Sequence, residues 1–81
     1  MRFTLYSRSY CHLCQDMLDA LVALRTPERP FTVDVVDVDA DPALVARFDE
    51  LVPVLFLGDE RLCHYFLDTP KVLAALAAHP R

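Results

Sequence analysis

Hydrophobic and polar residues alternate at the start of the chain and then change period. Phe3 and Leu5 alternate with more polar neighbours, which predicts a β-strand over residues 2–8. Apolar residues next recur at helical spacing, which predicts a helix that begins near residues 10–12 and ends before the prolines of residues 26–30. The apolar face of this helix consists of Cys14, Met17, Leu18, Leu21 and Val22.

A run rich in β-branched residues predicts a second strand over residues 31–39. Its aspartates, Asp34, Asp37 and Asp39, are candidates for a metal cluster. However, Asp34 and Asp37 are separated by an odd number of residues, so a regular strand directs them to opposite faces. We therefore interpret the three aspartates as solvated positions on an edge strand.

The middle of the chain predicts a short helix and then a hairpin. Asp41 offers an N-cap and Pro42 a first helical position, so a helix is expected to begin here. A buried strand opens just after Pro53, and a turn at residues 58–59 leads to its hairpin partner over residues 61–66. The second helix is expected to bury Leu44, Val45 and Phe48.

A final helix is predicted from Thr69, which is expected to be its cap, and Pro70. The core-facing positions of this helix are Val72, Leu73 and Leu76. The element order is therefore βαβ-α-ββα. A helical connection makes the first two strands parallel with a right-handed crossover, whereas a tight turn makes the last two antiparallel. We predict a single α/β domain over residues 1–81, with a four-stranded mixed sheet and helices on both faces.

Composition narrows the function. The chain has 81 residues, is 54% hydrophobic, and carries 8 Lys plus Arg against 12 Asp plus Glu, a net charge of −4. This acidic, mixed balance argues against nucleic-acid and anionic-membrane partners. No apolar run approaches the roughly 18 residues that span a bilayer. We therefore expect a soluble cytoplasmic protein, and an odd count of 3 cysteines, which is a poor disulfide framework, fits that compartment. Nothing in the sequence demands more than a monomer.

The pair Cys11 and Cys14 stands where the first strand gives way to the first helix. Unpaired N–H groups and the helix dipole favour a thiolate at this position. Cys14 lies on the same helical face one turn deeper, so it can attack a mixed disulfide formed at Cys11. Between them, His12 either supports the thiolate or is an exposed first-turn residue. The pair is therefore a candidate redox couple.

Two stretches resemble the glutaredoxin family: "LYSRSYCHLC" resembles its active-site segment, and "LVPVLFLG" resembles its Thr-Val-Pro strand. The resemblance covers nearly the whole chain and implies a thioredoxin-like fold. It implies that Cys11 is the nucleophile and Cys14 the resolving cysteine. It further implies that Arg8 meets a glutathione carboxylate, that the backbone of Val52 pairs with the substrate, and that Pro53 is cis.

The chain also departs from the family pattern. Leu13 replaces the usual tyrosine of the motif, and Leu51 replaces the threonine before Val-Pro. The family's Gly-Gly-x-Asp segment, which holds the γ-glutamyl end of glutathione, is here "CHYF" at residues 63–66. Bulky side chains in place of glycine speak against the usual glutathione contact, whereas dithiol chemistry needs only the two cysteines and the fold.

Three functions remain open from the sequence. The first is a thiol–disulfide oxidoreductase that acts on protein disulfides or glutathione mixed disulfides, with glutathione as a possible co-substrate and no other cofactor. Its substrate-side residues would be Arg8, His12, Leu13, Val52 and Pro53. The second is a metal-binding or iron–sulfur protein that uses Cys11 and Cys14 with Cys63 or with a second chain, and for zinc also His64. The third is a catalytically silent interaction module.

Cys63 is either a core residue or a third thiol that traps or resolves Cys11. The tyrosines are expected to pack rather than catalyse: Tyr6, Tyr10 and Tyr65.

Overall fold

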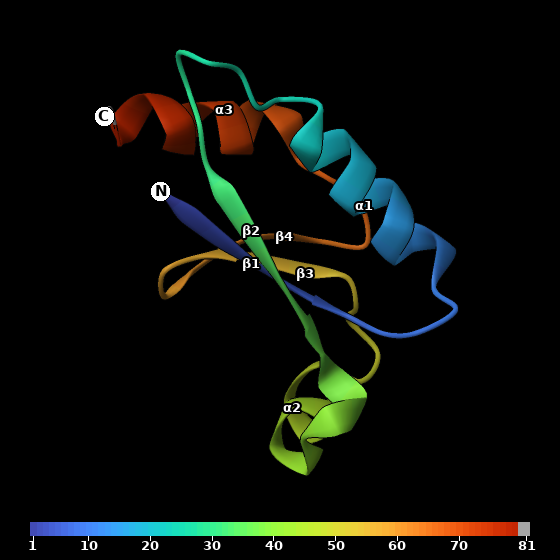
Figure 1. Ribbon diagram of the computed structural model, residues 1–81. Helices are drawn as coiled ribbons and strands as arrows, with labels where there is room; N and C mark the ends of the chain where they lie inside the picture. Colours follow the sequence, from blue (N-terminus) through green and yellow to red (C-terminus); the bar gives the residue numbers. More distant parts are fainter. Residues whose placement is uncertain (80–81) are drawn as a thin grey trace.

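The computed structural model describes residues 1–79, which form a mixed four-stranded sheet with helices on both sides (Figure 1). The strands are ordered β2-β1-β3-β4, with β1 and β2 parallel and the other neighbouring pairs antiparallel. This confirms the predicted α/β class and element order. The elements are β1 (Arg2–Ser7), α1 (His12–Val22), β2 (Thr32–Asp37), a 3-10 turn η1 (Val38–Ala40), α2 (Pro42–Phe48), β3 (Val54–Leu57), β4 (Glu60–His64) and α3 (Thr69–Ala78).

The central strands divide the apolar residues between two cores. Alternate residues of a strand point to opposite faces, so Leu55 packs under α1 and α3 while Val54 and Phe56 pack under α2. Figure 1 shows α1 and α3 on one side of the sheet and α2 on the other. The larger cluster consists of Phe3, Leu5, Met17, Leu21, Phe31, Leu55, Leu62, Val72 and Leu76.

The smaller cluster anchors α2 to the sheet through one aromatic residue. Phe48 is fully buried at the end of α2 and stacks on Tyr6 with ring centroids 4.7 Å apart. The edge of Phe56 meets the same ring at 5.8 Å, an arrangement that aromatic quadrupoles favour. The Arg47 guanidinium covers the Phe48 ring at 4.7 Å from its centroid. Phe48 thereby fixes the end of α2, from which the chain turns back toward β3.

The outer strand β4 contains a bulge. Its pairing with β3 runs from Leu57–Glu60 and Phe56–Arg61 to Leu55–Cys63, so Leu62 has no partner of its own in the register. As a result, the consecutive residues Leu62 and Cys63 both pack against the core beneath α1 and α3.

Several predicted boundaries were wrong by a few residues. β2 ends at Asp37 because its carboxylate accepts a hydrogen bond from the Asp39 amide, which closes the turn η1. Asp39 is therefore outside the strand. Asp68, not Thr69, caps α3, since its side chain accepts from the Lys71 amide at 3.1 Å. The cap predicted at Asp41 is confirmed, with its side chain accepting from the Ala43 amide at 2.9 Å.

The hydrophobic pattern also overestimated the core. Val22 and Leu73 were expected to face it but are exposed, because the preceding residues Leu21 and Val72 are fully buried and each further residue turns about 100° around the helix. The last strand was expected to reach Phe66 but ends at His64, and Tyr65 follows with a left-handed φ of 64°. Throughout residues 1–79, every helix is too short or too polar to traverse a bilayer.

Candidate redox site

Cys11 lies at the junction between β1 and α1, where the chain reverses direction. Tyr10 adopts a left-handed φ of 58°, and Cys11 returns to an extended conformation at the N-cap of α1. The Cys11 Sγ accepts a hydrogen bond from the Cys14 amide at 3.2 Å. This sulfur thus takes the place of the Ser, Thr or Asp oxygen that usually caps a helix. An N-cap position exposes the sulfur to unpaired amides and to the positive end of the helix dipole.

Cys11 and Cys14 form a disulfide, with their Cα atoms 5.2 Å apart. The two residues differ in exposure, since Cys14 is only 5% exposed whereas Cys11 is intermediate. The reason is the pitch of the helix: Cys14 lies one turn further on and faces the sheet. The accessible member of the pair is therefore Cys11, and Cys14 lies behind it.

An open cavity of about 540 Å³ lies beside the pair, between the β1–α1 junction and β2. Its lining residues are Leu5, Ser7, Arg8, Ser9, Tyr10, Cys11, His12, Cys14, Gln15, Leu18 and Val35. The cavity brings together four of the predicted site residues: Arg8, Cys11, His12 and Cys14. Leu13, Val52, Pro53 and Cys63 contribute nothing to its described lining. His12 is exposed at the first position of α1, and Tyr10 is fully exposed rather than packed as expected.

The Val52–Pro53 segment precedes β3. Its peptide bond is cis, Pro53 is buried and Val52 is half-buried. The Pro53 carbonyl accepts a hydrogen bond from the Tyr65 amide at 2.9 Å. The Tyr65 hydroxyl donates to the Glu50 carbonyl at 2.5 Å. Tyr65 therefore ties the end of β4 to the loop between α2 and β3 through both its backbone and its side chain.

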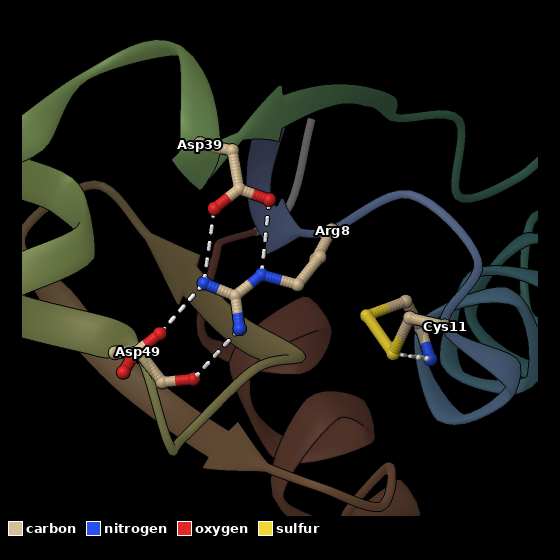
Figure 2. Close-up of a disulfide and its surroundings, with 5 residues drawn as sticks. Arg8, Cys11, Asp39 and Asp49 are labelled. Atoms are coloured by element: carbon tan, nitrogen blue, oxygen red, sulfur yellow. Dashed lines mark hydrogen bonds and ion pairs between the residues drawn. A yellow bond between two sulfur atoms is a disulfide. The ribbon is translucent and has the colours of Figure 1, made fainter.

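Arg8 adjoins the cysteines in sequence, but its guanidinium points away from the disulfide toward two carboxylates (Figure 2). Its Nε and Nη2 donate to the two oxygens of Asp39, each at 3.0 Å. Nη2 also donates to the Asp49 carboxylate at 2.7 Å, and Nη1 to the Asp49 carbonyl at 3.3 Å. Hydrogen bonds to Asp39 and then Asp49 raise the pKa of Arg8 further above its ordinary value. That Arg8 meets a glutathione carboxylate stays a prediction, and in this structure the group is already engaged.

Cys63 and His64 lie on different sides of β4. Cys63 is half-buried against the α1–α3 core, whereas His64 is exposed and rests against the Tyr65 ring at 4.7 Å. Burial raises the pKa of the Cys63 thiol, with a smaller opposing effect from the Asp68 backbone amide. In the described part of the chain, no three His, Cys, Asp or Glu side chains gather in a way that could hold a metal ion.

Sequence reasoning missed Asp39, Asp49 and Tyr65 as neighbours of the site. Asp39 was interpreted as a strand residue, and Asp49 follows a helix that is positioned by the tertiary packing of Leu44 and Phe48. The available signal was Arg8, an arginine beside the cysteines in an acidic chain. It indicated that carboxylate partners exist but did not identify them.

A Cys-x-x-Cys pair at the N-terminus of the first helix, within a βαβ unit of a four-stranded mixed sheet, defines a protein of the thioredoxin-like class. The family model described as "Glutaredoxin-like domain (DUF836)" matches residues 2–77. The chain belongs to this glutaredoxin-like family.

Solved structures agree with this assignment. A structural-genomics target protein from X. campestris is 33% identical, with a TM-score of 0.69 and coverage of 96% of this chain and 99% of that one. NrdH-redoxin from Escherichia coli, a glutaredoxin-like protein, is 28% identical, with a TM-score of 0.64 and coverage of 100% and 99%. Glutaredoxin C1 from Populus tremula x tremuloides shares the fold at 18% identity, with a TM-score of 0.62 and coverage of 98% and 81%. Among curated proteins, none matches the chain.

Proposed function

We propose that the protein is a dithiol oxidoreductase that reduces protein disulfides or glutathione mixed disulfides. The observation that carries this proposal is the arrangement of the two cysteines. Cys11 is the accessible N-cap of α1, while Cys14 is buried one turn behind it, within disulfide distance. This asymmetry gives each sulfur a separate role, since an outer thiolate can meet a substrate that an inner thiol cannot reach.

The reaction proceeds in two exchange steps. The Cys11 thiolate attacks one sulfur of the substrate disulfide, so a mixed disulfide forms and the other substrate sulfur leaves as a thiolate. Cys14, once deprotonated, then attacks the Cys11 sulfur and expels the remaining substrate thiolate. The substrate gains two electrons and the protein is left with the Cys11–Cys14 disulfide. An external thiol reductant, either glutathione or a dithiol donor of the thioredoxin type, must reverse this oxidation.

Two further features support the proposal. The amide-rich N-terminus of α1 stabilises negative charge on Cys11, both as the attacking group and as the group expelled during reduction. NrdH-redoxin from Escherichia coli is described as a glutaredoxin-like protein with a thioredoxin-like activity profile. We extend that profile to this chain and expect protein disulfides to be good substrates. We further propose a reducing compartment, the cytoplasm, as the place of action.

The test is to trap the first intermediate. Cys14→Ser removes the resolving thiol, so reaction with a small neutral disulfide is expected to leave one stable adduct, which mass spectrometry of peptides assigns to Cys11. Cys11→Ser is the matched variant and is expected to form no adduct at Cys14, because Cys14 is buried. Adduct formation on Cys63 alone, with Cys11 unreactive, would refute the proposal and favour a silent module.

A further inference from the structure

Arg8 is the only arginine or lysine among the described residues that line the cavity beside Cys11. Any anionic group that approaches the cysteines through this cavity would depend on Arg8 for charge complementarity. Arginine is well suited to that task, because its planar fork of N–H donors matches a carboxylate. The state of this one side chain therefore bears directly on which substrates the site accepts.

The hydrogen bonds of Arg8 are almost all committed within the protein. Asp39 from η1 accepts a bidentate pair of bonds, and Asp49 at the end of α2 accepts two more through its side chain and its carbonyl. All but one of the guanidinium N–H groups are thus used. The Arg8 side chain keeps only 31% of its exposure, whereas Asp39 and Asp49 keep 49% and 56%. The cluster consequently presents to solvent more carboxylate than guanidinium.

The net charge of this cluster is negative, since two carboxylates surround one guanidinium. We infer that Asp39 and Asp49 determine the substrate charge preference of the Cys11 site by withholding Arg8 from anionic substrates. The favoured substrates are then disulfides with neutral or basic flanking groups, such as a disulfide in a basic protein segment. Glutathione disulfide is disfavoured, because each of its halves carries one more carboxylate than ammonium. This inference rests on the proposed function, of which it specifies the substrate class.

The experiment compares three small disulfides: anionic glutathione disulfide, neutral hydroxyethyl disulfide and cationic cystamine. Each is reacted with the Cys14→Ser protein, and the rate constant of adduct formation at Cys11 is measured at low and at high salt. The test variant adds Asp39→Asn and Asp49→Asn, which keep the side-chain size but remove both charges. The matched control adds Asp34→Asn and Asp59→Asn, which change the net charge equally but remove no hydrogen-bond partner of Arg8. For each disulfide, the rate constant of the variant is divided by that of the Cys14→Ser protein, so the intrinsic reactivity of the disulfide cancels.

Freeing Arg8 reverses the sign of the local charge, and for charges about 10 Å apart this is expected to raise the glutathione disulfide rate roughly five- to tenfold at about 10 mM salt. The hydroxyethyl disulfide rate is expected to stay within about twofold, and the cystamine rate to fall. At about 0.2 M salt these differences shrink, because the Debye length becomes shorter than the separation. The control pair is expected to have less than half the effect of the test pair.

Two outcomes would overturn the inference. One is an equal change for all three disulfides, as expected if the cluster only braces the fold. The other is an equal effect of the test and control pairs, as expected if only total charge matters. Should the double variant fail to fold by circular dichroism, the single variants Asp39→Asn and Asp49→Asn are each expected to show part of the same charge ranking. If Cys11 reacts with none of the disulfides in any protein, the proposed function itself fails, whereas a reactive Cys11 without charge ranking refutes only this inference.

Discussion

Replacing Phe48 with alanine tests how α2 is held on the sheet. Phe48 is fully buried and touches Tyr6, Phe56 and Arg47 with its ring. A buried Phe→Ala change lowers the free energy of unfolding by about 3–5 kcal/mol. The loss of each aromatic pair, about 0.5–1.5 kcal/mol, is partly included in this estimate. A chain of this length is stable by roughly 4–12 kcal/mol, so the variant is expected to lose a large share of its free energy of unfolding.

The assay is urea unfolding of the reduced protein, followed by circular dichroism, with thermal melting as a second measurement. At roughly 4–8 °C per kcal/mol for a domain this small, the Tm is expected to fall by about 15 °C or more. Phe66→Ala is the matched control, because Phe66 is 70% exposed and its removal leaves no cavity. Equal destabilisation by the two substitutions would refute the view that α2 is anchored by this ring.

Two other predictions concern an N-cap and a thiol. Asp41→Ala removes the acceptor for the Ala43 amide and is expected to lower the free energy of unfolding in urea by about 0.5–2 kcal/mol. Asp16→Ala, at an exposed position, is the control and is expected to lower it less. Equal losses would exclude a capping role for Asp41. Burial raises the pKa of the Cys63 thiol, so its alkylation should be slow near pH 8 and should accelerate only when the pH exceeds the ordinary pKa of a cysteine. The folded state then holds this proton at a pH where the unfolded chain has lost it, so stability should fall as the pH rises above about 9. Alkylation at the rate of urea-unfolded protein would contradict the assigned burial.

The sequence predicted the elements of this fold because their signals are local. Alternation in β1, helical spacing from Cys14 and the Asp41-Pro42 cap each depend on residues within one or two turns. The candidate redox pair was found for the same reason, since Cys11 and Cys14 are close in sequence. The parallel and antiparallel pairings followed from connection length alone.

Contacts between distant segments were beyond this reasoning. The bonds from Arg8 to Asp39 and Asp49 join residues separated by 31 and 41 positions, and they depend on the turn that Asp37 closes after β2. Nor did the pattern foresee that Tyr65 would reach the Glu50 carbonyl. Such contacts arise from tertiary packing, and no periodicity in one segment encodes the position of another.

The bulge at Leu62 has a consequence for assembly. β4 is an outer strand, and its free edge offers backbone groups to which a strand of another molecule could add. The displaced register at Leu62 interrupts the even spacing of those groups and increases the local twist. A foreign strand could then pair with only a short stretch on either side of the bulge. We therefore expect this edge to resist strand addition and amyloid-type stacking, even though the neighbouring β3 consists entirely of apolar residues.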